Sequence, residues 1–282
     1  MRISIVGLGL IGGSMALDLK ANGFASEIIG VDINAEHCDE ALSIKLVDRI
    51  LPIDVALEQS EVMILAMPVQ HIVKILPEIL NMVKSQVIID VGSTKQLTSE
   101  SVKHHPSRDN YLATHPMAGT EFSGPTAAVR ELFRDKAAIF CDVELSSAAA
   151  LKLATDLYDC LGMRIINMKS QEHDLHAAYV SHISHISSFA LALTVLKKEK
   201  DAQNIFNLAS GGFDSTVRLA KSSSEMWTPI FTQNAENIIN VLDTYISELK
   251  QFREAIETQN AEALNHIISE ANKIRKILAD TD

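Results

Sequence analysis

The sequence has little of what marks secreted or nucleic-acid-binding proteins. Its three cysteines, Cys38, Cys141 and Cys160, are far apart and form no Cys-x-x-Cys pair, so neither a disulfide framework nor a thiolate zinc site is indicated. Acidic residues outnumber basic ones by 36 to 25, the formal net charge is −11, and no basic stripe is present, which argues against binding to nucleic acid. We expect reduced thiols and a cytoplasmic location.

Long apolar runs and an export signal are also missing. The first residues, Met1 to Val6, lead directly into a predicted strand, without a basic region followed by a long apolar segment. No apolar run approaches the roughly 20 residues that span a bilayer, so we expect no membrane association. With 282 residues, 47% of them hydrophobic, the chain can form one large or two modest globular domains.

Glycine becomes rare in the second half of the chain, and this change marks a division. After Gly162 it recurs only at Gly211 and Gly212, where we predict a break between helices. Up to Met168, short runs rich in Val and Ile alternate with helical patterns, which predicts βαβ units and a mostly parallel sheet covered on both faces. The expected strands are 2–6, 28–31, 62–67, 86–91, 111–114, 137–141 and 164–168.

The second half is helical in pattern throughout. Apolar residues recur there at spacings of three and four. In the segment 230–252 they occupy more than one face, which predicts packing against other helices, including those of a second subunit. No mixed βαββαβ pattern follows the last predicted helix, 261–278, so we expect no regulatory module there. The chain is therefore expected to have an α/β domain at 1–168 and an all-α domain at 169–282.

A glycine-rich motif, Gly7-Leu-Gly9-Leu10-Ile11-Gly12, follows the first predicted strand. The first glycine permits a tight turn, the second lets the backbone approach a pyrophosphate, and the third lets the next helix pack on the strand. The N–H groups at the start of that helix, at Leu10 and Ile11, face the phosphates in such sites. This context predicts a Rossmann-type dinucleotide-binding domain. A purely structural glycine turn and a site for flavin or another nucleotide are the alternatives.

Asp32 indicates which dinucleotide is bound. It follows Gly12 by about 20 residues, at the end of the second predicted strand, where a carboxylate accepts hydrogen bonds from the adenosine ribose. The next residues, 33–36, include no Arg or Lys that could neutralise a 2′-phosphate. We therefore predict NAD rather than NADP as the cofactor.

Polar residues also follow two later strands. The segment Asp90–Lys95, which contains Ser93, leaves the expected end of one strand, and His115 leaves the end of the next. Ligands of open α/β sheets bind outside the carboxyl ends of the strands, where the nicotinamide is expected. Ser93 is by residue type more typical of a helix N-cap than of a catalytic group. His115, with an ordinary pKa of about 6.5, could take a proton from an alcohol as its hydride leaves, or could be a plain strand-end histidine before Pro116.

Four segments together, 7–12, 90–95, 115–121 and 211–227, resemble the prephenate dehydrogenase family, and the resemblance covers essentially the whole chain. Members of that family convert prephenate to 4-hydroxyphenylpyruvate, CO₂ and NADH in tyrosine biosynthesis. Close relatives use arogenate, the amino analogue. The resemblance also implies a homodimer formed through a helical domain that helps to bind the substrate.

The resemblance implies a role for each matching residue. His115 would accept a hydrogen bond from the substrate's ring hydroxyl, and Ser93 would hold that hydroxyl and the nicotinamide in register. Arg218 would clamp a carboxylate, for which a planar bidentate donor suits best. The further substrate contacts implied are Thr120, Glu121, His182, His185, Gly211 and Trp227.

Some of these assignments have alternatives on residue type alone. The segment Tyr179–His185 resembles the family's Ser-His-x-Pro-His, but Ser184 stands where proline is usual, so the pose of His185 stays open. Without the resemblance, Arg218 would be interpreted as a solvated helix residue and Trp227 as part of the core.

The histidine-rich segment that contains His173, His176, His182 and His185 raises the alternative of a metal site. At about 100° per residue, His173 and His182 would lie half a turn apart on an ideal helix. One metal ion could not take all four, and no Asp or Glu completes a recognised ligand pattern. We expect no metal, and contacts to cofactor, substrate or partner subunit instead.

Other functions remain open with the same nucleotide site. They are an arogenate dehydrogenase, another NAD-dependent hydroxyacid dehydrogenase with a helical second domain, and a binding module that senses NAD(H). A pure sensor would not need Ser93, His115 and Arg218 as a set.

Overall fold

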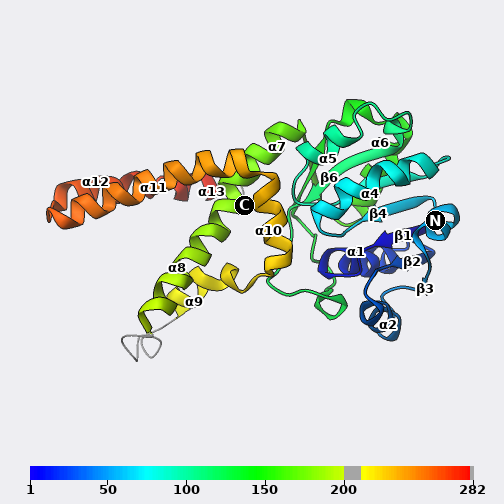
Figure 1. Cartoon of the computed structure of the whole chain (residues 1–282), viewed down its shortest axis with the longest axis horizontal. Coiled ribbons are helices and arrows are strands. Elements are labelled where there is room, and N and C mark those ends of the chain that lie inside the picture. Colours follow the sequence, from blue (N-terminus) through cyan, green and yellow to red (C-terminus); the bar gives the residue numbers. More distant parts are fainter. Residues whose placement is uncertain (200–210, 280–282) are drawn as a thin grey trace. The chain divides into compact units, whose positions relative to one another are not determined.

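The computed structural model describes residues 1–199 and 211–279 (Figure 1). Contacts within the chain divide it into two units, Met1–Ala235 and Glu236–Asp282. The first unit contains the whole sheet and all helices up to α10. The second contains most of α11 and the helices that follow it.

The first unit is built on one eight-stranded sheet, with strand order β3-β2-β1-β4-β5-β6-β7-β8. All neighbouring strands are parallel except β6 and β7, which confirms the predicted mostly parallel α/β sheet. The two-residue strand β3 was not predicted, because so short a segment carries no alternating pattern. The strands are β1 (Arg2–Val6), β2 (Glu27–Val31), β3 (Arg49–Ile50), β4 (Val62–Leu65), β5 (Val87–Asp90), β6 (Tyr111–Pro116), β7 (Ala137–Cys141) and β8 (Arg164–Met168).

Helices cover both faces of this sheet. The central strands β4 and β5 are buried along their whole length, as expected where both faces are packed. One face packs against Met15, Leu19 and Leu157 from α1 and α6, and the other against Leu76 and Ile79 from α4. These helices are α1 (Leu10–Ala21), α2 (Ala35–Ser43), α3 (Ile53–Gln59), α4 (Val69–Met82), α5 (Gln96–Ser101) and α6 (Ala148–Cys160).

After β8 the described residues form helices and no strand, as the sequence predicted. A π-helical segment, Ala178–His182, separates α7 from α8, and a 3-10 turn, Arg218–Lys221, follows α9. The predicted helix 261–278 is divided at residues 272–273 into α12 and α13. The helices are α7 (Ser170–Ala177), α8 (Ile183–Glu199), α9 (Gly211–Val217), α10 (Ser224–Gln233), α11 (Ala235–Glu257), α12 (Ala261–Ala271) and α13 (Ile274–Ala279).

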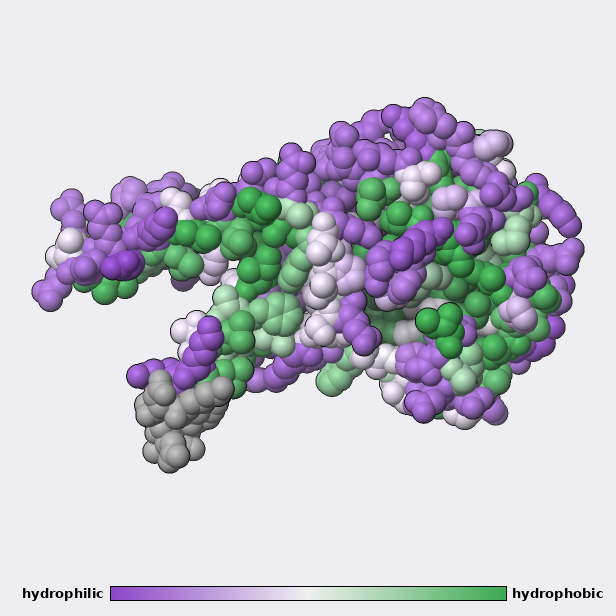
Figure 2. Space-filling view, viewed as in Figure 1, coloured by the Kyte–Doolittle hydropathy of each residue, from purple (hydrophilic) through white to green (hydrophobic). Residues whose placement is uncertain are grey.

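One stretch in the described part of the chain, Ser170–Lys198, is long and apolar enough to cross a membrane by length and composition alone. Histidine and serine interrupt the apolar residues of this stretch, so it is not an unbroken apolar run, and the expected lack of membrane association stays a prediction. His173 and Asp174 at the start of this stretch are buried and bonded to polar partners, whereas only 11% of its apolar window is buried within the chain. Apolar side chains of α8 such as Leu193 and Leu196 are exposed on the single chain. Figure 2 shows hydrophobic residues on the surface of the helices that follow the sheet.

Candidate active site

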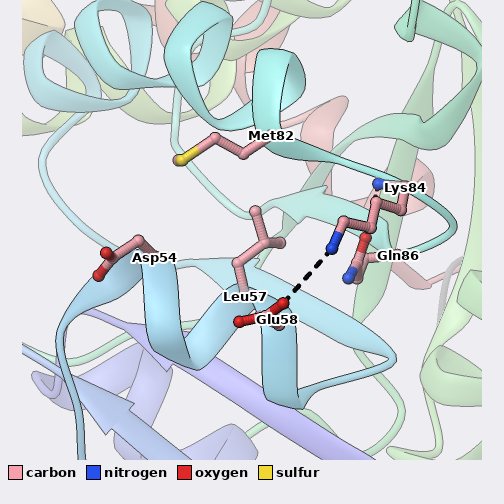
Figure 3. Close-up of a pocket in the computed structure, with 6 residues that line it drawn as sticks. All are labelled: Asp54, Leu57, Glu58, Met82, Lys84 and Gln86. Atoms are coloured by element: carbon pink, nitrogen blue, oxygen red, sulfur yellow. Dashed lines mark hydrogen bonds and ion pairs between the residues drawn. The ribbon is translucent and has the colours of Figure 1, made fainter.

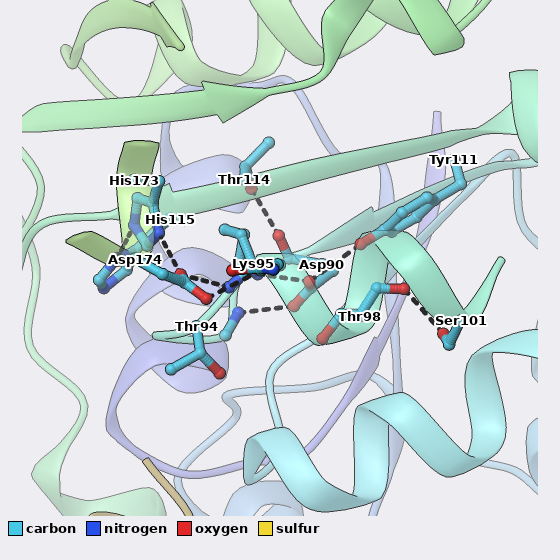
Figure 4. Close-up of polar contacts among 12 residues, drawn as sticks. Asp90, Thr94, Lys95, Thr98, Ser101, Tyr111, Thr114, His115, His173 and Asp174 are labelled. Carbon is cyan, nitrogen blue, oxygen red and sulfur yellow. Dashed lines mark hydrogen bonds and ion pairs between the residues drawn. The ribbon is translucent and has the colours of Figure 1, made fainter. Parts of the chain in front are cut away.

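The carboxyl end of β6 carries His115, which takes part in a chain of hydrogen bonds. Its Nδ1 lies 2.8 Å from Nε2 of His173, and Nδ1 of His173 lies 2.7 Å from Oδ1 of Asp174 (Figure 4). His173 and Asp174 belong to α7 and are buried. A carboxylate only accepts, so Nδ1 of His173 donates to Asp174; with a single proton on the His173 ring, its Nε2 accepts the Nδ1–H of His115. Nε2 of His115 is thereby left with a free lone pair.

The surroundings of His115 keep it uncharged. The ring is half-buried, and desolvation is the main cause that lowers its pKa well below the usual value of about 6.5. The neighbours His173, Lys95 and His182 lower the pKa of His115 further. At neutral pH this histidine is therefore a base, with its acceptor nitrogen fixed by the bond to His173.

Ser93 lies in the loop between β5 and α5, next to this chain of bonds. The predicted N-cap role for Ser93 is wrong, because α5 begins only at Gln96 and has no side-chain cap of its own. Instead Asp174 accepts the N–H of Lys95 at 2.7 Å and that of Gln96 at 3.0 Å. Within residues 1–199 and 211–279 no hydrogen bond engages the Ser93 hydroxyl, which leaves it available to a ligand.

The glycine motif has the geometry of a dinucleotide site. Gly7 has a φ of +97°, and a Cβ there would lie 2.5 Å from the carbonyl oxygen of Ala66. A Cβ at Gly12 would lie 2.1 Å from the carbonyl oxygen of Gly7. A Cβ at Gly9 would meet no atom within 4 Å, so this position opens onto free space. The fold thus requires glycine at positions 7 and 12, whereas Gly9 leaves room for a ligand to approach the protein backbone.

The start of α1 at this motif offers its N–H groups to an anion. No side chain caps the helix at Gly9, and no acidic residue occupies its first turn. Leu10 is buried and Ile11 packs against the core of the sheet, so these two residues offer chiefly their backbone to a ligand. A pyrophosphate fits such a helix start.

Asp32 follows β2 and is held in place by backbone N–H groups. Its Oδ2 accepts from Leu8 at 2.9 Å and its Oδ1 accepts from Asn34 at 2.9 Å. Each carboxylate oxygen keeps a second lone pair, which a ribose hydroxyl can use. Together with the open helix start, these residues fit NAD.

His182 also lies close to the base. The i to i+5 bonding of the π-helical segment widens the turn, so the half-turn separation expected between His173 and His182 for an ideal helix does not apply. Nδ1 of His182 lies 3.1 Å from Nδ2 of Asn234, which also donates to the backbone oxygen of Asp174 at 2.6 Å. Burial lowers the pKa of His182 to about 4, so it is neutral.

His185 and Trp227 form a second pair. Their rings stack with centroids 3.5 Å apart at 28°, and Trp227 is buried against Val69 and Phe231. The Nδ1 of His185 lies 3.1 Å from the backbone oxygen of Ser181, which makes Nδ1 the donor and Nε2 an acceptor. The interpretation of Trp227 as a core residue therefore agrees with its burial.

Arg218 and Glu121 form a third pair. Nη1 of Arg218 lies 3.2 Å from Oε2 of Glu121, and the Arg218 side chain is 50% exposed. In the same loop, Oγ1 of Thr120 accepts the N–H of Phe122 at 3.3 Å. Gly211 begins α9 and is exposed, and a Cβ there would meet no atom within 4 Å, so the structure does not require glycine at this position.

Sequence reasoning missed four residues of the site. His173 was expected only in general terms to contact cofactor, substrate or partner subunit, and Lys95 was named only as the end of the segment Asp90–Lys95, whereas Asp174 and Asn234 were not considered. Across the described residues no group of three or more His, Cys, Asp and Glu side chains could hold a metal ion. The adjacent pair His173-Asp174 was the available signal, since a carboxylate beside a histidine commonly orients its ring.

Neither of two hollows on the surface is lined by His115. One is lined by Asp54, Glu58, Met82, Lys84 and Gln86 and lies at the amino end of β5, the opposite edge of the sheet from the predicted site (Figure 3). The other lies between the start of α4 and α10. Neither is lined by a residue predicted to act on substrate.

The model of the prephenate dehydrogenase nucleotide-binding domain matches residues 15–167, and the model of the prephenate dehydrogenase dimerization domain matches residues 169–270. By contacts, however, α7 to α10 belong to the same unit as the sheet. The domain boundary placed at residue 168 stays a prediction.

Similar proteins span the whole chain. Prephenate dehydrogenase of Bacillus subtilis is 31% identical over 97% of this chain and 75% of its own length, and cyclohexadienyl dehydrogenase of Zymomonas mobilis is 31% identical over 98% and 96%. Prephenate dehydrogenase of Aquifex aeolicus, in complex with hydroxyphenyl propionate and NAD⁺, has a TM-score of 0.85 at 26% identity, covering 100% of this chain and 98% of that one. Arogenate dehydrogenase of Synechocystis has a TM-score of 0.75 at 27% identity, covering 99% and 100%.

These matches agree with the predicted fold and cofactor. The residues that match the nucleotide-binding domain contain the sheet from β2 onward and begin just after the glycine motif, and the helices after β8 correspond to the dimerization domain. The chain therefore belongs to the prephenate dehydrogenase family of NAD-dependent oxidoreductases.

Proposed function

We propose that the protein oxidises prephenate to 4-hydroxyphenylpyruvate with release of CO₂, as a cytoplasmic homodimer in tyrosine biosynthesis. The observation that carries this proposal is the bond between His115 and His173, which leaves a lone pair on Nε2 of a neutral histidine at the carboxyl edge of the sheet. Oxidation of a ring alcohol needs a base at this position.

His115 accepts the proton of the substrate's ring hydroxyl at Nε2. The positive charge that develops on its ring is stabilised by the Asp174 carboxylate, through His173. NAD, when bound, supplies the acceptor for the hydride from the same ring carbon. The Ser93 hydroxyl holds the substrate hydroxyl, and formation of the aromatic ring drives the loss of the ring carboxylate. General-base help of this kind contributes about 10²- to 10⁴-fold.

Arg218 binds a carboxylate of the substrate. A guanidinium has five N–H donors, and in this structure one nitrogen of Arg218 bonds Glu121. The remaining donors can hold a carboxylate in a bidentate arrangement. Glu121 then orients the guanidinium, while Thr120, Gly211, His182, His185 and Trp227 line the pocket.

Arogenate is the alternative substrate of the same site. It carries an ammonium group where prephenate carries a keto group, and the relatives include enzymes named for prephenate and for arogenate. The test is NADH formation by the purified protein with NAD and either substrate. Turnover of prephenate supports the proposal, whereas turnover of arogenate alone keeps the chemistry and changes the substrate. No turnover of either would favour another hydroxyacid dehydrogenase or an NAD(H)-sensing module.

A further inference from the structure

We propose that the buried ion pair between Asp90 and Lys95 is a positioning pair that fixes the Ser93 loop against the strand bearing His115. This inference rests on the proposed function, since it concerns the geometry of that reaction. Neither residue was assigned a role by the sequence motifs.

The pair is completely buried, with both side chains 0% exposed. Burying two charges is costly, and replacing such a pair by apolar side chains of similar volume is often neutral or stabilising. Stability alone therefore does not explain a lysine in this place. The location of Lys95, two residues after Ser93 and close to His115, points to a role in arranging these two residues.

Asp90 connects the loop to the strand. Its Oδ1 accepts the N–H of Gly92 at 2.7 Å, and its Oδ2 binds Lys95 and the hydroxyl of Tyr111, the latter at 3.1 Å (Figure 4). Its backbone oxygen accepts the hydroxyl of Thr114 at 2.7 Å. Gly92 precedes Ser93 and Thr114 precedes His115, so one residue holds the neighbours of both reacting groups.

Lys95 connects this arrangement to the hydrogen-bonded histidines. Its backbone N–H donates to Oδ1 of Asp174, the same oxygen that His173 bonds. Its ammonium group is one of the neighbours that lower the pKa of His115. The groups that face His115 are thus Lys95 beside α5, His173 and Asp174 on α7, and His182 in the π-helical segment.

The test uses the double variant Asp90→Asn/Lys95→Met, which removes both charges, keeps similar volumes and leaves no unpaired buried charge. We expect it to fold, to bind NAD with the wild-type Kd and to show a kcat lower by about 10-fold or more, because small displacements of reacting groups are costly. Loss of the Lys95 cation should also raise the pKa of His115, measured by NMR titration. The control Lys152→Met/Asp156→Asn removes an exposed pair on α6. It should change neither kcat nor the pKa of His115.

A milder variant, Tyr111→Phe, removes only one donor to Asp90 and should lower kcat a few-fold with an unchanged Kd for NAD. If the double variant does not fold, the kcat of Tyr111→Phe tests the proposal instead. The proposal would be overturned if the double variant folds and keeps both the wild-type kcat and the wild-type pKa of His115. A wild-type kcat in Tyr111→Phe would also overturn it. Wild-type protein that turns over neither prephenate nor arogenate would instead overturn the proposed function, and the NMR titration would still test the pair.

Discussion

His115 and His173 are 58 residues apart in the sequence, yet their rings share a hydrogen bond of 2.8 Å from Nδ1 to Nε2. This bond joins the end of β6 to α7 and fixes the tautomer of both rings, because Asp174 accepts the Nδ1–H of His173 and leaves Nε2 of His173 to accept from His115. The acceptor nitrogen of His115 is therefore set before substrate binds. The predictions below depend on this arrangement.

The activity should persist to acidic pH. Because the pKa of His115 is well below about 6.5, the base loses activity by protonation only below that pH. We expect the acid limb of the kcat/KM profile to have its midpoint below pH 6.5, rising to a plateau as the pH increases. A midpoint at or above pH 7 would show that another group is the base, or that the ring is not desolvated.

Replacing the carboxylate that orients the histidines should slow the reaction. In Asp174→Asn the amide can present a donor to His173, which disturbs the tautomers of both histidines. We expect kcat to fall about 10- to 100-fold, with a loss of stability of about 1 to 2 kcal/mol because the amide keeps one acceptor oxygen for the two N–H groups of Lys95 and Gln96. Steady-state kinetics and urea unfolding measure the two effects. Asp156→Asn, at an exposed position, is the matched control. An unchanged kcat in Asp174→Asn would show that Asp174 does not orient the histidines for the reaction.

The arginine substitution should act mainly on substrate binding. Arg218→Ala removes a charge-assisted, bidentate contact worth about 1.5 to 3 kcal/mol, so KM for prephenate should rise about 10- to 100-fold with a smaller change in kcat. Lys221→Ala, on the same 3-10 turn and paired with Asp214, is the control and should leave KM unchanged. An unchanged KM in Arg218→Ala would show that Arg218 is a solvated surface residue that does not bind the substrate.

Local motifs were predictable from the sequence, because they follow from the chain near each residue. The glycines Gly7, Gly9 and Gly12 and the carboxylate of Asp32 lie where a strand, a turn and a helix must place them. The position of His115 was predictable for the same reason, as it lies at the end of a strand, Tyr111–Pro116.

Contacts between distant elements were not predictable in this way. The pairing of His115 with His173 depends on how α7 packs beside β6, which no local pattern encodes. Ser93 was interpreted as a helix cap because its residue type favours that role, whereas Asp174 from another element supplies the acceptor. The π-helical segment before Ile183 likewise changes the angular spacing that an ideal helix would give.

The helical half should form a dimer. Large apolar side chains on α8, including Leu193 and Leu196, are exposed on the single chain, and this region matches the family's dimerization domain. Burying them against a second copy stabilises association. Sedimentation velocity at micromolar concentration should show a dimer, and Leu196→Glu should shift it toward monomer. A monomer at all concentrations for the wild-type protein would contradict the assembly.

The most direct test of the central claim is the turnover of His115→Asn. The account predicts a kcat for NADH formation lower by about 10²-fold or more, with an unchanged Kd for NAD, because the base acts in the transition state and not in cofactor binding. His176→Asn, an exposed histidine on α7, is the control and should keep wild-type turnover. Near-normal turnover by His115→Asn would contradict the assignment of His115 as the base.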